Sequence, residues 1–123
     1  MRTMVGRPDQ ALGLWAESLV LQRLQRAGWC CLDQRWRCRW GELDLVLAKP
    51  GRLLVVEVKA RRRLQRDAGG LAAFDGPKRR RLACSLRCWL AAHPAWAAAS
   101  VQVQLALVQP PGRVRWLPVV HLG

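Results

Sequence analysis

The sequence predicts an α/β domain with a mixed central sheet flanked by helices, in the element order αβββαββ. Two segments, 9–27 and 77–92, repeat apolar residues at the three- and four-residue spacing of a helix face. Other segments carry the alternating or continuous apolar pattern of strands, and turns containing proline or glycine bound them. A length of 123 residues favours a single domain, 1–123. Strands are expected at 29–37, 40–48, 52–61, 100–108 and 113–120.

The first helix is expected to run from Asp9 to Ala27. Asp9 is a suitable N-cap, and Gly28 can follow the last turn in the left-handed conformation that ends many helices. Glu17 falls at the border of the apolar face, which places its carboxylate near the sheet. The apolar face comprises Leu12, Ala16, Leu19, Val20 and Leu24.

The second and third strands are expected to pair as a hairpin around Pro50-Gly51. A turn centred there pairs residues whose numbers sum to 101, and a four-residue loop would keep the same centre. Asp44 then lies opposite Glu57, and Glu42 lies opposite Lys59. Because side chains alternate along a strand, this register predicts that all four side chains share one face of the sheet.

The second half of the chain begins with a basic loop from Arg61 to Pro77, a good first residue for the second helix. The segment Pro110-Pro111-Gly112 should form the turn between the last two strands, and Pro118 is expected on an edge strand. Of the seven tryptophans, Trp15, Trp89 and Trp116 are expected in the core, whereas Trp36 and Trp40 are the exposed candidates for stacking on bases.

The charge is strongly positive. Lys and Arg number 21 and Asp and Glu 8, which gives a net charge of +13, and 18 of the basic residues are Arg. Such a charge balance indicates a polyanion as partner. The expected polyanion is nucleic acid, with DNA expected before RNA. A compositional bias toward Arg and Ala is the alternative cause. Two basic runs, Arg61–Arg63 with Arg66 and Lys78–Arg81, flank the predicted site, with a merely solvated surface as the alternative. The residues of these runs expected to contact phosphate are Arg61, Arg62, Arg63, Lys78, Arg79 and Arg80.

Cysteine use and hydropathy favour a cytoplasmic protein without membrane contact. Five cysteines are an odd number, and Cys30 adjoins Cys31, which favours reduced thiols over a disulfide framework. No apolar run follows the first residues, so no signal peptide is expected, and no stretch is long enough to span a membrane. Cys84 and Cys88, one helical turn apart, provide with His93 too few ligands for a metal site.

The opposed acids Asp44 and Glu57 call for a physical explanation. Two carboxylates about 5 Å apart repel by roughly 3 kcal/mol at an effective dielectric near 20. A divalent cation, Mg²⁺ or Mn²⁺, would remove this repulsion, with the Val58 carbonyl as a further oxygen ligand. Lys59 could then position an attacking water. The alternative is a structural salt-bridge cluster in which Lys59 and Arg61 neutralise the acids.

The glutamates are unusually concentrated. The chain has three, at positions 17, 42 and 57. Two of them lie on the predicted hairpin and the third on the inner border of the first helix. Glutamates used for solubility alone would be scattered over exposed surfaces, so this placement favours a functional site.

Two strand motifs resemble a known family. The segment Gly41–Val46, GELDLV, followed by Val55–Arg61, VVEVKAR, is similar to the signature of the YraN-like family of small bacterial proteins, which belongs to the restriction-endonuclease-like, PD-(D/E)xK superfamily. The resemblance covers nearly the whole chain. It includes the helix with Gly13 and Glu17, and Lys78 at the start of the second helix.

This resemblance implies a restriction-endonuclease-like core with the site at one edge of the sheet. It assigns Asp44, Glu57 and Lys59 to the motif positions, and Glu17 to the helix acid that joins the site in many superfamily members. The chain departs from the usual family pattern at three positions near the site. It has Arg35 in place of Asn, Ala16 in place of Gly and Ala60 in place of Thr.

Together these observations predict a metal-dependent endonuclease-like protein that hydrolyses nucleic-acid phosphodiesters. Asp44 and Glu57 would hold Mg²⁺ or Mn²⁺, Lys59 would position the water, and Glu17 or Glu42 would assist. One alternative is a catalytically inactive, basic nucleic-acid-binding module of the same fold, and another is a structural protein of a ribonucleoprotein. A homodimer is compatible with the sequence, which does not distinguish it from a monomer.

Overall fold

The structure is a computed structural model that describes residues 8–62 and 76–119, and its element order agrees with the predicted αβββαββ. The bounds differ from those expected by at most two residues, apart from a short 3₁₀ helix that was not predicted. The elements are α1 (Pro8–Arg26), β1 (Cys30–Cys38), β2 (Gly41–Lys49), β3 (Arg52–Ala60), α2 (Gly76–Ala92), η2 (Pro94–Trp96), β4 (Ser100–Gln109) and β5 (Arg113–Pro118).

The ends of α1 follow local backbone chemistry. Gly28 has a φ of 96°, and the amides of Gly28 and Trp29 donate to the carbonyls of Gln25 and Leu24. This is the Schellman arrangement expected of a glycine after the last turn. The N-cap prediction for Asp9 was wrong, because α1 begins at Pro8, whose fixed φ suits the first turn, and Asp9 is therefore the second residue of the helix.

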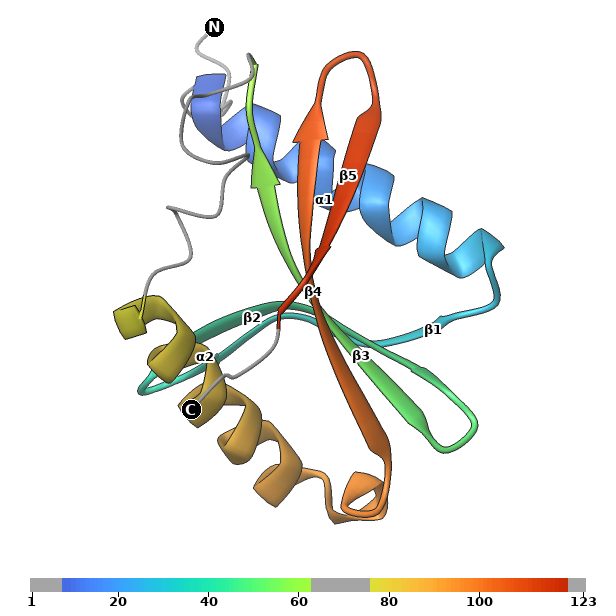
Figure 1. Ribbon diagram of the computed structural model, residues 1–123, viewed down its shortest axis with the longest axis vertical. Helices are drawn as coiled ribbons and strands as arrows, with labels where there is room; N and C mark the ends of the chain where they lie inside the picture. Colours follow the sequence, from blue (N-terminus) through green and yellow to red (C-terminus); the bar gives the residue numbers. More distant parts are fainter. Residues whose placement is uncertain (1–7, 63–75, 120–123) are drawn as a thin grey trace, which may run out of the picture.

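The five strands form one mixed sheet in the order β1-β2-β3-β4-β5 (Figure 1). The β3–β4 pair is parallel, and the other neighbours are antiparallel. Between β2 and β3 the pairs run from Leu45–Val56 to Lys49–Arg52, so residue numbers sum to 101 as predicted, and the loop contains two residues. Pro118 ends the edge strand β5, also as predicted.

The helices lie on opposite sides of the sheet, and each covers an apolar core (Figure 1). The buried core on the α2 side consists of Leu43, Val46, Ala48, Leu53, Val55, Leu82, Leu86, Trp89, Val103 and Leu105. The buried core on the α1 side consists of Ala16, Val20, Leu24, Trp29, Leu45, Leu47, Leu54, Val56, Ala106 and Val108. Among the described helices, none is long and apolar enough to cross a membrane.

The hairpin β2–β3 opens into a fork before it reaches the acidic residues. Its ladder ends at the Leu45–Val56 pair. Beyond that point β2 stays paired with β1 as far as Gly41, whereas β3 stays paired with β4 as far as Ala60. The expected cross-strand pairing of Glu42 with Lys59 is therefore wrong, because each strand follows its outer neighbour.

The direction of the side chains on β2 also changes at this level. Leu45 packs in the α1-side core, whereas Leu43 packs in the α2-side core, although strict alternation would place both on one side. On the neighbouring strand β1, Arg35 has a φ of 47° in the left-handed region. We attribute the reversal to this residue, because it lies between the pairs Gln34–Leu45 and Trp36–Leu43.

Two tryptophan predictions need correction. Trp36 was expected to be exposed, but the reversal turns it into the α2-side core, where its ring lies edge-on to His93. Trp116 was expected in the core but is 38% exposed on β5. Trp89 is fully buried, Trp15 packs against the α1-side core, and Trp40 is 40% exposed, all three as expected.

Candidate functional site

Asp44 and Glu57 meet at the fork and exchange hydrogen bonds with each other's strand. The backbone amide of Asp44 donates to Glu57 Oε2 at 3.3 Å, and the amide of Val58 donates to Asp44 Oδ2 at 2.8 Å. These amides lie where the β2–β3 ladder has ended, so the carboxylates replace the missing strand partners. No described residue donates a hydrogen bond to the second oxygen of either carboxylate.

The environment disfavours a negative charge on both acids. The pKa of Glu57 is raised to about 8, mainly by burial and then by the nearby charge of Asp44. Burial also raises the pKa of Asp44, although the Val58 amide and Lys59 act in the opposite direction. Paired acids with raised pKa values are typical of functional sites.

Two more acids surround the fork, and arginines of β1 neutralise them. Glu17 Oε1 lies 3.2 Å from Arg35 Nε, although no hydrogen bond is aligned on this buried oxygen. Glu42 accepts a hydrogen bond from Arg37 Nε at 2.9 Å. The pKa of Glu17 is raised, mainly by burial and then by the charge of Asp44, so the helix acid does lie close to the fork as expected.

The salt-bridge alternative takes a different form from the one expected. Lys59 makes no ion pair with any described acid, and the Arg61 side chain donates to the carbonyl of Ala60 instead. The ion pairs are made from the edge strand, by Arg35 and Arg37. They reach Glu17 and Glu42, whereas no ion pair between described residues reaches Asp44 or Glu57.

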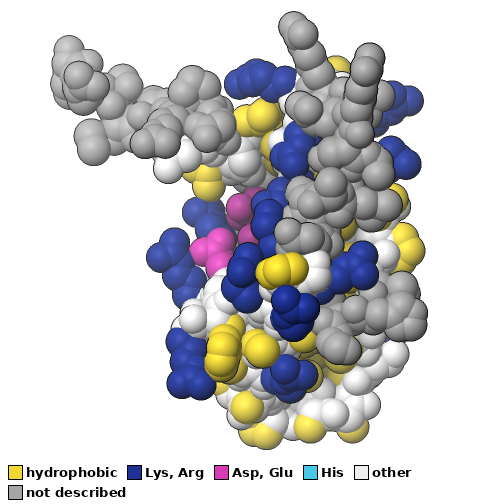
Figure 2. All heavy atoms as spheres, turned by 60° about the vertical axis from the view of Figure 1, so that its left-hand side comes forward, with side chains coloured by type: hydrophobic (Ala, Val, Ile, Leu, Met, Phe, Trp, Pro, Cys, Tyr) yellow, Lys and Arg dark blue, Asp and Glu magenta, His cyan; other side chains and the backbone are white. Residues whose placement is uncertain are grey.

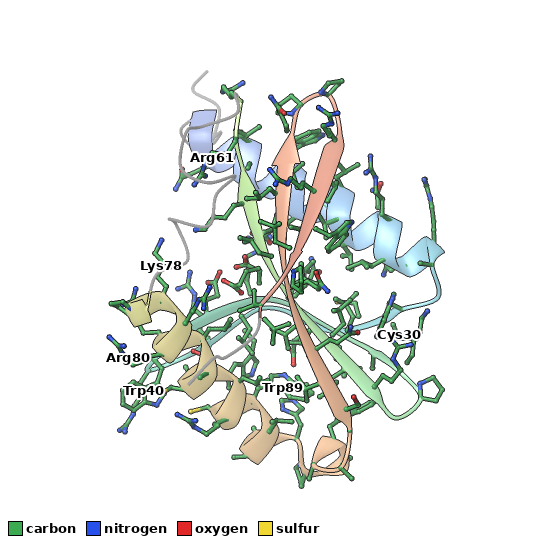
Figure 3. All side chains as sticks on the ribbon, in the orientation of Figure 1. Cys30, Trp40, Arg61, Lys78, Arg80 and Trp89 are labelled. Atoms are coloured by element: carbon green, nitrogen blue, oxygen red, sulfur yellow. The ribbon has the colours of Figure 1, made fainter. Side chains whose placement is uncertain are left out.

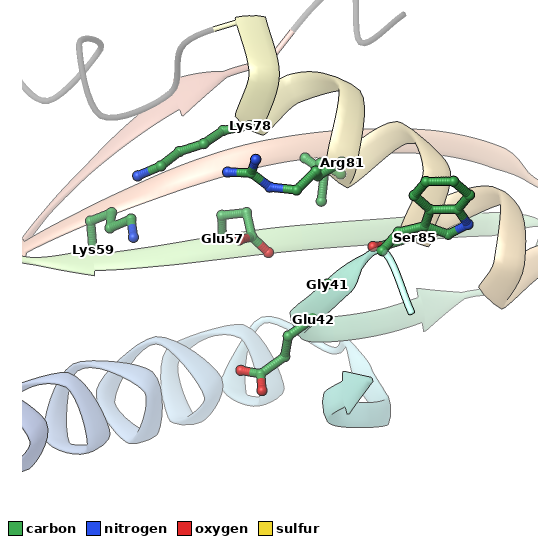
Figure 4. A pocket seen from close by; sticks show the side chains of 9 residues that line it. Gly41, Glu42, Glu57, Lys59, Lys78, Arg81 and Ser85 are labelled. Carbon is green, nitrogen blue, oxygen red and sulfur yellow. The ribbon is translucent and has the colours of Figure 1, made fainter. Parts of the chain in front are cut away.

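A cavity of about 180 Å³ opens between the fork and α2. Lys78 and Arg81 of α2 extend over Glu57 and Lys59 of β3, whereas the Glu42 carboxylate points away from α2 (Figure 4). The four acidic and basic side chains of the predicted hairpin site therefore do not all share one face. The residues lining the cavity are Trp40, Gly41, Glu42, Glu57, Lys59, Lys78, Arg81, Leu82 and Ser85.

Arg81 and Ser85 line this cavity but were not among the predicted site residues. The signal was present in the helical spacing, because residues 78, 81, 82 and 85 lie on one face of α2. The Ser85 hydroxyl oxygen also accepts a hydrogen bond from the Cys38 thiol at 3.5 Å. The same oxygen lies 3.5 Å from the position that a Cβ on residue 41 would occupy. Gly41 has a φ of 148°, a backbone conformation that favours glycine, although the space itself would admit a Cβ.

The predicted phosphate-binding residues are divided between two elements. Arg61 and Arg62 follow β3, and Lys78 faces the cavity from α2. Arg79 and Arg80 belong to the same helix but do not line the cavity. Arg63 lies outside the described residues. Figure 3 shows Arg61, Lys78 and Arg80 toward the same side of the molecule, and Figure 2 shows the acids of this face ringed by Lys and Arg side chains.

Asp44 and Glu57 are the candidate ligands for a divalent cation. Within residues 8–62 and 76–119, no group of three or more His, Cys, Asp or Glu side chains gathers closely enough to hold a metal ion. Mg²⁺, however, is usually held by one or two carboxylates together with water and phosphate oxygens. Asp44 and Glu57 fit this pattern, because each has one oxygen that accepts no hydrogen bond from a described residue.

Comparison with known proteins gives the chain a family. The family model described as "Uncharacterised protein family UPF0102" matches residues 16–109. The chain belongs to the UPF0102 family. The resemblance seen in the two strand motifs is thereby confirmed, and with it the place of this family in the restriction-endonuclease-like superfamily.

Full-length relatives support the assignment. A UPF0102 protein of Synechococcus sp. (strain CC9902) is 53% identical over 118 residues, which cover 94% of this chain and 98% of that protein. One from Prochlorococcus marinus (strain MIT 9303) is 54% identical over 113 residues, covering 89% and 90%. One from Acaryochloris marina (strain MBIC 11017) is 41% identical over 107 residues, covering 80% and 62%.

The matched UPF0102 segment contains every residue of the candidate site. Glu17 lies near its start, and Asp44, Glu57, Lys59 and Arg81 all fall within residues 16–109. The α/β architecture agrees with a restriction-endonuclease-like fold. The family description names no reaction, so the chemistry has to be argued from the fork itself.

Proposed function

We propose that this UPF0102 member is a metal-dependent nuclease that hydrolyses nucleic-acid phosphodiesters, with DNA as the expected substrate. One observation carries the proposal: Asp44 and Glu57 are held together at the fork, with a pKa of about 8 for Glu57. Their amide-capping hydrogen bonds use one oxygen of each carboxylate. Glu57 also lines a cavity that Lys78 and Arg81 cover, so a ligand bound in this cavity would contact its carboxylate.

The remaining residues have roles that follow from their positions. Lys59 and Glu57 line the same cavity, so the Lys59 ammonium can orient an attacking water or a phosphate oxygen. Lys78 and Arg81 lie over them and can bind the phosphates on either side of the scissile bond. Glu17, on the α1 side of the fork, would hold a water or share the cation.

Asp44 and Glu57 would be the carboxylate ligands of Mg²⁺ or Mn²⁺, with the Val58 carbonyl as a third oxygen. When bound, the cation would neutralise the two acids and the charge that develops on the phosphate. The residues of the chain would bind and align the strand around it. The five cysteines form no disulfide with one another, in keeping with action in the cytoplasm, where thiols stay reduced.

The alternative function is a basic nucleic-acid-binding module without catalysis. The hydrogen bonds to the amides of Asp44 and Val58 support this alternative, because they give the Asp44 and Glu57 carboxylates a structural role even without a cation. Under this alternative, Lys78 and Arg81 would still bind phosphate, and the acids would serve only to close the fork.

Cleavage of duplex, flap, junction and single-stranded substrates with Mg²⁺ and with Mn²⁺ tests the proposal. Asp44→Asn and Glu57→Gln should abolish cleavage while keeping an oxygen that can accept the amide hydrogen bonds. Arg52→Gln is the control, because Arg52 lies at the β2–β3 turn, at the other end of β3 from Lys59. It should cleave at the wild-type rate.

A thermal-shift titration with Mg²⁺ completes the test. Wild-type protein should gain thermal stability on addition of the cation, and Glu57→Gln should lose this response. If the wild type neither cleaves any of these substrates nor responds to either cation, while still binding nucleic acid, the module without catalysis is the correct description.

A further inference from the structure

We infer that Trp40 and the arginines around it form a binding site for an unpaired nucleotide of a nucleic-acid strand, next to the acidic fork. The inference rests on the proposed function, because it takes nucleic acid as the ligand of the same region. It adds a substrate class: strands with unpaired bases, as in single strands, flaps and frayed ends.

Trp40 occupies an unusual position for a tryptophan. Together with Arg39 it forms the loop of the β1–β2 hairpin, and it is 40% exposed, whereas Trp29 and Trp89 are buried. Figure 3 shows it beside the half of α2 that carries Lys78 and Arg80. A large ring kept exposed at a hairpin tip, inside a basic region, is more typical of a contact surface than of a core.

Two hollows meet at this tryptophan. The cavity over the fork, of about 180 Å³, and a second, more open hollow of about 410 Å³ share four residues of their walls, Trp40, Gly41, Glu42 and Arg81. The second hollow falls in the size range of small-ligand pockets. A group bound in it would contact Trp40 while its chain continued over the fork toward Glu57.

The chemistry of the second hollow suits a nucleotide. The Arg39 guanidinium lies 4.6 Å from the centroid of the Trp40 ring, and Arg39 and Arg81 supply positive charge in the hollow, where Arg37 is paired with Glu42. Aromatic rings stack on any nucleobase, since every base has a π face, and guanidinium groups fork onto phosphate oxygens. A planar, anionic ligand matches both features, and a nucleotide provides both in one unit.

The stacking requirement selects unpaired bases. Inside a duplex, neighbouring base pairs cover both faces of each base, so Trp40 could not stack without extracting a base from the helix. A single strand or flap presents free faces. Stacking at Trp40 therefore favours such strands over duplex, while phosphate contacts at Lys78 and Arg81 serve both.

Fluorescence anisotropy in EDTA tests this site without any metal-dependent cleavage. The probes are labelled oligothymidylate, oligouridylate, an abasic strand with the same number of phosphates, and a duplex of equal length. Trp40→Ala should weaken binding of the base-carrying strands by roughly 5- to 150-fold. Binding of the abasic strand and of the duplex should stay at the wild-type level.

Trp116→Ala is the matched control, because Trp116 is 38% exposed on β5, at the opposite edge of the sheet from β1. It should bind every probe like the wild type. Trp40→Phe, which keeps a ring, should retain most of the affinity for base-carrying strands, and thermal melts establish that each variant is folded. A loss with only one of the two base-carrying strands supports the site and shows which of the two strands it selects.

Three results would overturn the inference. These are an equal loss on the abasic strand, a loss on the duplex as large as on the single strands, or no greater loss for Trp40→Ala than for Trp116→Ala. None of them bears on cleavage, which Asp44→Asn and Glu57→Gln test separately. An absence of cleavage would likewise leave the EDTA binding result in place.

Discussion

Arg35 illustrates how much one residue contributes to the site. Its φ of 47° lies in the left-handed region, where Asn is several-fold enriched and most other residues are strained. Asn is the residue that the family usually has at this position, so the departure noted in the sequence has a conformational cost. In return, the guanidinium of Arg35 lies against Glu17 and offsets part of the rise that burial causes in the pKa of Glu17 and of Asp44.

Replacing Arg35 separates the backbone effect from the charge effect. Arg35→Asn and Arg35→Ala both remove the half-exposed ion pair to Glu17, which contributes at most about 1 kcal/mol. Only Asn tolerates the left-handed conformation, so Arg35→Asn should be more stable than Arg35→Ala by about 1 kcal/mol. Chemical denaturation measures the difference, and equal stabilities would show that the conformation carries no strain.

Glu57 should make the stability of the protein depend on pH. Its pKa in the folded protein, about 8, lies above the ordinary value of 4.5, so the folded state binds more protons between these two pH values. Its contribution is therefore favourable at low pH and is lost as the pH rises through about 8. Without divalent cations, the wild type should lose on the order of a few kcal/mol of unfolding free energy relative to Glu57→Gln.

Denaturation of both proteins from pH 5 to pH 9 in EDTA measures this difference. The curves should converge at the acidic end and separate progressively toward the basic end. Curves that stay parallel over the whole range would mean that Glu57 has an ordinary pKa. Added Mg²⁺ should narrow the gap at the basic end, because a bound cation favours the charged carboxylate.

At the level of elements, the fork between β2 and β3 determines the site. The two strands pair with each other from the turn to Leu45 and Val56, and then each continues with its outer neighbour. Asp44 and Glu57 are the next residues on either side, and their carboxylates take over from the ladder. The same opening that requires polar caps also creates the cavity beneath α2.

The capping role of Asp44 can be separated from its charge. Asp44→Asn keeps an oxygen for the Val58 amide, whereas Asp44→Ala leaves that partly buried N–H without its partner. Asp44→Ala should be less stable than Asp44→Asn by about 1–3 kcal/mol. Asp44→Asn itself should be as stable as the wild type or more stable, because repulsion from Glu57 is relieved.

Thermal melts of both Asp44 variants with and without Mg²⁺ provide the measurement. Neither variant should respond to the cation. A strong destabilisation of Asp44→Asn, together with a wild type that ignores Mg²⁺, would favour a purely structural role for the carboxylates.

The sequence predicted the fold well where local patterns determine it. Alternation along the strands and the Pro50-Gly51 turn gave the register, and glycine at position 28 gave the end of α1. No local pattern in the sequence indicates the reversal at Arg35, because arginine rarely adopts a left-handed conformation. For this reason the exposure of Trp36 was predicted wrongly.

The site was harder to predict, because the fork depends on β4, which lies far along the chain. The local sequence therefore gave no reason to reject the pairing of Glu42 with Lys59. Arg81 belonged to a basic run beside the predicted site but was not assigned to the site, although its helical spacing from Lys78 was visible.

At the scale of the whole molecule, charge is arranged around the fork. The net charge is +13, yet the acids of the hairpin gather in one place on a face rich in Lys and Arg (Figure 2). The Lys and Arg side chains of this face attract a polyanion, and the acids form a small region of negative charge among them. That arrangement concentrates a strand where the proposed chemistry would occur.

Binding of duplex DNA should therefore depend steeply on salt. With about five phosphate contacts, the slope of log affinity against log salt should be roughly −4 to −5. Lys78→Gln and Arg81→Gln should each reduce the magnitude of the slope by about 1, whereas Arg52→Gln should leave it unchanged. Titrations at several NaCl concentrations measure the slope, and a value near zero would exclude the basic face as the binding surface.

The parallel pairing of β3 with β4 has a consequence for the order of events during synthesis. The pairs between β2 and β3 join residues that are close in the sequence, so this hairpin can form as soon as both strands have left the ribosome. The strand that draws β3 away from β2, Ser100–Gln109, is made only after α2. We therefore expect a nascent chain to carry its acids without a fork or a cavity. The site would be completed only when the last part of the sheet is in place, so a half-made chain would lack the proposed activity.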